Sequence, residues 1–172
     1  MSQAMFHTRR TLLLGLAASA LSACGFQPRG ELVLPTAMRK VSLHGSQPSG
    51  LSQALTQLLQ SNGAEIVTST PPPADTLMIR VSNIHIQRRE ALIDRQANVR
   101  QIELLLRAQL DASHADGRLI IEHESFEAVR STSYNPLSLL AQGEEDQRLQ
   151  RELDEQLAQT ILARLRSRLA AP

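Results

Sequence analysis

Cys24 is the only cysteine among the 172 residues, and its surroundings indicate a covalent reaction at its thiol. A cysteine thiolate is an intrinsically strong nucleophile. Arg9 and Arg10 precede an apolar run from Leu12 to Leu21, which is too short to cross a bilayer as a helix. A basic start, a short apolar run and small residues at its end are typical of a secretory signal. We therefore expect residues 1–23 to be removed, leaving Cys24 at the start of the exported chain.

The run Leu21-Ser22-Ala23-Cys24-Gly25 resembles the lipobox of bacterial lipoproteins. This resemblance implies that the Cys24 thiol is diacylated, that the signal is cut before it, and that the new amino terminus is acylated as well. Such an anchor exceeds the two hydrophobic signals that stable membrane attachment requires. Gly25 in place of an aspartate favours transfer to the outer membrane in that class. Residues 8–13 also resemble a twin-arginine export signal, so the export route stays open.

After residue 23 the basic side chains are almost all arginine, with Lys40 as the single lysine. The guanidinium group presents a planar fork of donors that matches phosphate and carboxylate groups, so an arginine-rich surface suits a phosphorylated ligand. A genome that favours arginine codons explains the same bias equally well. One strand connection concentrates four of these residues, which are Arg88, Arg89, Arg95 and Arg100.

Composition argues against nucleic-acid binding. Loss of Arg9 and Arg10 with the signal leaves 16 of the 18 basic residues against 17 acidic ones, so no net basic field attracts nucleic acid. Only three aromatic side chains follow residue 23, which is too few for a surface that stacks bases or sugars.

The sequence also lacks recognisable catalytic and metal-binding patterns. It contains no Gly-x-Ser-x-Gly, no glycine-rich phosphate loop and no His-Glu-x-x-His. The histidines after residue 23 do not fall at metal-ligand spacing within one element, and they are His44, His85, His114 and His123. We therefore expect no metal, no cofactor and no enzyme activity.

The elements that position these residues begin with a strand and a helix. Apolar residues within 38–44 predict the first strand. Leucines at helical spacing predict a helix from residue 51, with Ser49-Gly50 before it and Asn62-Gly63 as its stop. A short extended run over 64–70 ends at three consecutive prolines.

Alternating apolar residues predict three longer strands in the middle of the chain. The alternation changes phase between residues 77 and 86, which predicts either a bulge or a switch of face near Ser82-Asn83. Residues 99–112 keep one apolar face with Leu105 as the exception, and Asp116-Gly117 predicts a tight turn into a return strand over 119–130. The connection from Arg88 to Asn98, between the first two of these three strands, lacks glycine and proline. The hairpin that they form is therefore expected to extend beyond the sheet with the four arginines at its tip.

A long amphipathic helix is expected over residues 144–169. Leucine and isoleucine form one stripe that predicts packing against the sheet, while acids in the first turn and arginines near the end match the helix dipole. The whole pattern predicts a single α+β domain over 38–170, with a mostly antiparallel four-stranded sheet packed by two helices. A signal peptide over 1–23 and a lipidated tether over 24–37 would precede it.

The start of the exported chain, Cys24-Gly25-Phe26-Gln27-Pro28-Arg29-Gly30, resembles the LptE family of lipopolysaccharide-assembly lipoproteins. Asn135-Pro136 with Ala141, before the acidic start of the last helix, adds to this resemblance, which covers essentially the whole chain after residue 23. It implies a non-enzymatic, lipid-anchored outer-membrane protein that faces the periplasm and barrel lumen, where it partners and plugs the LptD β-barrel. It also implies binding of lipopolysaccharide, for which the candidate phosphate contacts are Arg95 and Arg100, then Arg88 and Arg89.

Two other classes of protein are weighed against this interpretation. A free-standing periplasmic-facing lipoprotein that carries lipid would need an apolar cavity, whereas the alternating strand around Leu104 fits a sheet with one covered face. A membrane-anchored hydrolase is the weaker alternative, and a screen for turnover would address it.

Overall fold

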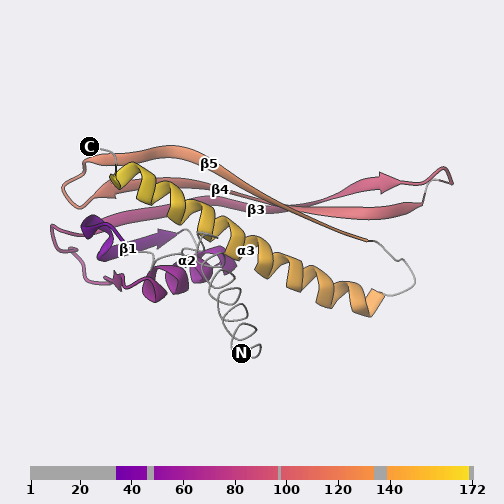
Figure 1. The fold of residues 1–172 in the computed structure, drawn as a ribbon, viewed down its shortest axis with the longest axis horizontal. Helices are drawn as coiled ribbons and strands as arrows, with labels where there is room; N and C mark the ends of the chain where they lie inside the picture. Colours follow the sequence, from indigo (N-terminus) through magenta and orange to yellow (C-terminus); the bar gives the residue numbers. More distant parts are fainter. Residues whose placement is uncertain (1–33, 46–48, 97, 134–138, 171–172) are drawn as a thin grey trace, which may run out of the picture. The chain divides into compact units, whose positions relative to one another are not determined.

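A five-stranded mixed sheet with the strand order β2-β1-β3-β4-β5 forms the centre of the fold (Figure 1). The structure is a computed structural model that describes residues 34–45, 49–96, 98–133 and 139–170, with side chains in the last range from residue 143. The strands are β1 (Lys40–Gly45), β2 (Glu65–Ile66), β3 (Leu77–Ile93), β4 (Val99–His114) and β5 (Leu119–Ser133). The helices are η1 (Thr36–Met38), α2 (Gly50–Ser61) and α3 (Leu139–Ala170).

The predicted α+β class with two main helices is confirmed, but the sheet has five strands where the sequence predicted four. The additional strand is β2, which has two residues and pairs in parallel with β1. Strand β1 also pairs in parallel with β3, while β3, β4 and β5 pair antiparallel. Parallel neighbours need a crossover connection, and α2 supplies it between β1 and β2.

Helix α2 begins and ends where its capping residues predict. The Ser49 hydroxyl accepts a hydrogen bond from the Ser52 amide at 3.1 Å, and Gly63 adopts a φ of +89° just beyond the helix. One face is fully buried through Leu51, Leu55 and Leu59. Helices α2 and α3 lie on the same face of the sheet, and their apolar side chains form one core with the strands.

The long β3–β4 hairpin contains the predicted irregularity. Pairing shifts register between Ser82 and His85, and Asn83 has a φ of +50°, so the change of phase in the sequence does mark a bulge. Gly117, with a φ of +87°, forms the predicted tight turn between β4 and β5. At the other end, the hairpin extends past the start of α3 (Figure 1).

Helix α3 starts at Leu139, five residues before the predicted position, so the acids at 144–146 are not in its first turn. Their assignment to the helix dipole is therefore wrong. The apolar stripe packs as predicted, with Leu153, Leu157 and Ile161 fully buried.

None of the helices in the described part of the chain combines the length and apolar character that crossing a bilayer requires. Cys24 and Asn135-Pro136 lie outside the described residues.

Candidate ligand-binding hairpin

The hairpin tip, residues 91–96 and 98–100, is organised by the carboxylate of Asp94. Its Oδ1 accepts hydrogen bonds from the backbone amides of Gln96 at 2.9 Å and Asn98 at 2.8 Å. Its Oδ2 accepts from Arg100 Nε at 2.7 Å. These bonds hold the pKa of Asp94 below its ordinary value, and the bond from the Asn98 backbone amide has the largest effect. The tip is therefore a defined turn whose carboxylate is already engaged.

The structure divides the four predicted arginines into two groups. Arg95 and Arg100 lie together at the tip, where Arg95 is exposed and forms no ion pair with any described residue. Arg88 and Arg89 are consecutive in a strand and so point to opposite faces. Arg88 faces α3 and pairs with Asp146, whereas Arg89 pairs with Glu103 at 3.0 Å. The four side chains thus do not form one cluster.

A set of polar contacts, here called the arm clamp, joins the hairpin and its neighbour β5 to α3. It consists of the Arg88–Asp146 pair, the Thr132–Glu145 hydrogen bond of 3.2 Å and the Arg130–Glu152 pair of 3.8 Å. Arg148 lies between the two glutamates on α3 and contacts each at 2.6 Å. Its hydrogen bond holds the pKa of Glu145 below the ordinary value. Three acids of α3, Glu145, Asp146 and Glu152, therefore contact the sheet, a role that the sequence analysis missed.

Apolar side chains at the tip were also missed. Leu92 is 54% exposed and Ile93 is 53% exposed. The available signal was the Ala91-Leu92-Ile93 run inside a connection that is otherwise rich in charge. A small cavity of about 230 Å³ lies beside the tip and is lined by Arg88, Arg89, Glu90, Val99 and Ile102. The outer hairpin thus places guanidinium groups next to aliphatic groups.

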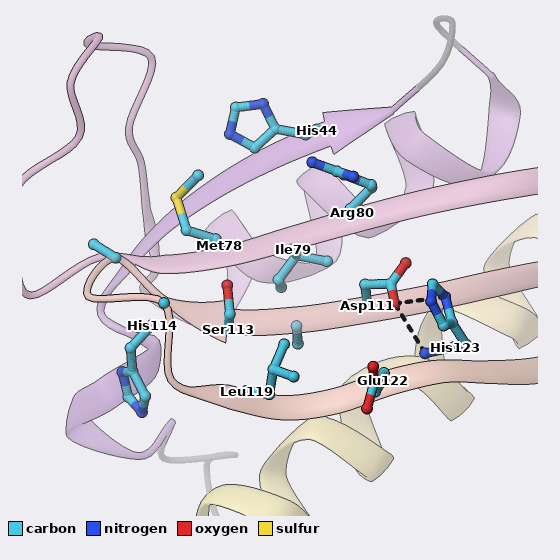
Figure 2. A pocket seen from close by; sticks show the side chains of 13 residues that line it. His44, Met78, Ile79, Arg80, Asp111, Ser113, His114, Leu119, Glu122 and His123 are labelled. Carbon is cyan, nitrogen blue, oxygen red and sulfur yellow. Dashed lines mark hydrogen bonds and ion pairs between the residues drawn. The ribbon is translucent and has the colours of Figure 1, made fainter.

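A larger cavity of about 420 Å³ lies toward the opposite end of the sheet (Figure 2). His44, Arg80 and Asp111 occupy adjacent positions on three paired strands there. Asp111 Oδ1 accepts from the His123 backbone amide at 2.8 Å and lies 3.0 Å from its Nδ1. Within the described residues, no three His, Cys, Asp or Glu side chains are grouped as metal ligands. The charges of this cavity are mixed in sign and partly paired, so it offers a weaker case for an anion site than the tip does.

The comparison with protein families decides the identity. A sequence model described as "LptE: Lipopolysaccharide-assembly" matches residues 38–165. The chain belongs to the LptE family. It is 31% identical over 166 residues to LPS-assembly lipoprotein LptE of Yersinia pestis (strain Pestoides F), covering 94% of this chain and 77% of that protein. The LptE of Yersinia pseudotuberculosis serotype O:1b (strain IP 31758) gives the same values.

Solved structures share the LptE fold. An uncharacterised lipoprotein B from Nitrosomonas europaea superposes with a TM-score of 0.70 at 18% identity, covering 86% of this chain and 94% of that one. The rare lipoprotein B from Shewanella oneidensis gives a TM-score of 0.64 at 22% identity, covering 74% and 94%. LptE proteins are non-enzymatic assembly lipoproteins, so the hydrolase alternative is discarded.

Proposed function

We propose that this LptE-family protein is an outer-membrane lipoprotein that partners and plugs an LptD-like β-barrel and binds lipopolysaccharide during its assembly at the cell surface. The observation that carries this proposal is the family match over residues 38–165. The Yersinia relatives, which are named LPS-assembly lipoproteins, support it over nearly the whole chain.

The charged residues on one face of the sheet suit a partner whose interior is polar and filled with water. The sheet face away from α2 and α3 carries cross-strand ion pairs such as Arg107–Glu127 at 2.8 Å. The lumen of an outer-membrane barrel is polar, so a plug with such a face keeps its charges solvated or paired. The lipid-carrier alternative is less well supported, because in the described part the leucines of α2 and α3 fill the space over the covered face.

The lipid-anchored end completes the proposal. Residues 1–23 would act as the signal peptide, Cys24 as the acylated residue, residues 24–37 as the tether and 38–170 as the folded domain. The protein would then face the periplasm and the barrel lumen from the outer membrane. The support is the lipobox-like run before Cys24 and the lipoprotein names of the relatives.

Within this function, Arg95 and Arg100 are the first candidates for contact with lipid A phosphates. Hydrogen bonds between guanidinium groups and phosphates are charge-assisted and contribute about 1.5–3 kcal/mol each. Arg88 and Arg89 follow, since both are held by a carboxylate partner, whereas in the first pair only Arg100 is held, by Asp94, and Arg95 forms no ion pair with any described residue. Solvated charges, or contacts of the arginines with acidic groups of the barrel, are the alternative.

A paired charge reversal tests the arginine assignment. Arg95→Glu with Arg100→Glu is expected to weaken lipopolysaccharide binding at moderate salt and to leave co-purification with the barrel intact. The matched control is Arg39→Glu with Arg118→Glu, which changes the net charge equally at exposed positions far from the tip. Unchanged ligand binding would reject the arginine site, and failure of the unmodified protein to co-purify with a large β-barrel would reject the partner.

A further inference from the structure

Exposed aliphatic side chains gather on the outer half of β3. The described part of the chain has four large apolar side chains that are exposed, and three of them are Ile86, Leu92 and Ile93. Exposed apolar side chains that occur singly need no explanation, whereas a group of them marks a contact surface. The fourth, Leu119, lies at the opposite end of the sheet beside the cavity in Figure 2.

The fold keeps Leu92 and Ile93 in solvent. The register of β3 against β4 shifts on both sides of Leu92, which bends the end of the hairpin away from regular pairing. Helix α3 starts short of the tip, so it cannot cover these side chains (Figure 1). The hydrogen bonds to Asp94 then fix the turn that follows, so a ligand would meet a preformed surface.

Cationic groups border these apolar side chains. Arg95 follows Ile93 after one residue, and the Arg100 side chain, although paired with Asp94, remains 58% exposed. An acidic protein segment would satisfy the guanidinium groups but leave the aliphatic side chains in water. An anionic amphiphile satisfies both, because its phosphate accepts from arginine while its acyl chains cover the apolar surface.

We propose that Leu92 and Ile93 form an acyl-chain contact that works together with the phosphate contact of Arg95 and Arg100. The inference rests on the proposed function and deepens it, since it assigns recognition of the hydrophobic part of the ligand to named residues. Apolar contact of this size changes affinity by roughly tenfold or more when it is removed.

The first test measures the affinity of the full-length protein for two probes. One is lipid A, and the other is the same phosphorylated disaccharide without its acyl chains. Leu92→Thr with Ile93→Thr, which places a β-branched side chain suited to a strand at both positions, is expected to weaken lipid A binding at least about tenfold and to leave binding of the deacylated probe unchanged. Leu119→Thr is the control, because Leu119 is 59% exposed far from the tip.

The outcomes separate this inference from the function on which it rests. Equal lipid A binding by the threonine variant and the unmodified protein overturns the acyl contact alone. Absence of lipid A binding by the unmodified protein overturns the proposed ligand itself. Circular dichroism melting establishes that the variant is folded.

A second test leaves the hairpin sequence almost intact and examines the protein in cells. A photo-crosslinking p-benzoylphenylalanine residue replaces Leu92, Ile93 or Leu119 in turn. Adducts with acylated lipid at 92 and 93, but not at 119, are expected. Adducts only with a protein, or no adducts at 92 and 93, overturn the acyl contact.

Discussion

Asp154 on α3 lies against Gly50, the first residue of α2, so closely that a Cβ atom at position 50 would be 2.1 Å from its Oδ2. Asp154 is only 6% exposed. The absence of a side chain at position 50 therefore lets the two helices approach with a carboxylate between them.

Gly50→Ala is expected to destabilise the fold. Overpacking costs about 1–3 kcal/mol, which exceeds the roughly 0.4–1 kcal/mol that an alanine gains by restricting the unfolded chain. The matched control is Gly143→Ala in α3, where an added Cβ meets nothing within 4 Å, so that variant should be stabilised. Urea unfolding measures both. Equal shifts for the two variants would contradict the close contact.

Asp154→Asn is expected to stabilise the protein at neutral pH. Burial, with a smaller contribution from the charge of Glu155, raises the pKa of Asp154 from 3.8 to about 6. The folded state therefore binds this proton more tightly than the unfolded state does. The contribution of this group to the free energy of unfolding should rise as the pH falls from about 6 to about 4, and reach its minimum above about pH 7.

The free energy of unfolding of Asp154→Asn should exceed that of the unmodified protein by about 3 kcal/mol at most. The variant should also lose the part of the pH dependence that comes from Asp154. Denaturant titrations between pH 4 and pH 8 measure it. If the variant proves less stable at pH 8, the carboxylate must instead be stabilised in its charged form by the start of α2.

The leucine stripe of α3 should prove structural. Leu157→Ala or Ile161→Ala removes a fully buried side chain and is expected to cost about 2–5 kcal/mol. Arg151→Ala changes an exposed residue of the same helix and serves as the control. Melting curves that do not respond to either core substitution would place the stripe on a partner surface.

Local patterns predicted the elements whose signals are contained in the sequence. The leucine spacing with Ser49 and Gly63 located α2, and the change of apolar phase located the bulge at Asn83. The extended run predicted over 64–70 contains β2, but its place in the sheet could not be predicted, because a two-residue strand pairs only through the position of β1. The start of α3 was placed too late because its first residues, 139–143, lack the charge pattern used to locate it.

The candidate site likewise combines features that local sequence patterns predict with features that only the fold determines. The separation of Arg88 from Arg89 follows from the two-residue period of a strand and was available in the sequence. The pairing of Arg88 with Asp146 joins positions 58 residues apart, so only the fold could show it. Asp154 precedes the buried Ala158 and Leu162 at intervals of four residues, a spacing that could have indicated its burial.

Acylation of Cys24 is the prediction that concerns the anchored end. Cys24→Ala is expected to abolish lipidation and to leave an uncleaved or soluble species, because no other thiol is present in the chain. Mass spectrometry of the mature amino terminus measures it. A version that starts near Arg29 should still fold and bind the barrel, since the folded domain is expected to make most of the contact. A free, unacylated Cys24 in the exported protein would refute the lipoprotein assignment.

The arm clamp should control motion of the hairpin more than global stability. Asp146→Ala removes the α3 partner of Arg88, and a partly exposed pair at the protein surface contributes about 0.2–1 kcal/mol. Backbone amides of β3 beyond Ser82 should then exchange with solvent faster, because opening this part of the hairpin breaks fewer contacts with α3, while the amides of β1 keep their protection. Glu127→Ala is the matched control, since it breaks the Arg107 pair on the opposite face without touching α3. Hydrogen exchange resolved by residue compares the two variants, and equal acceleration in both would mean that the clamp has no specific role in holding the hairpin.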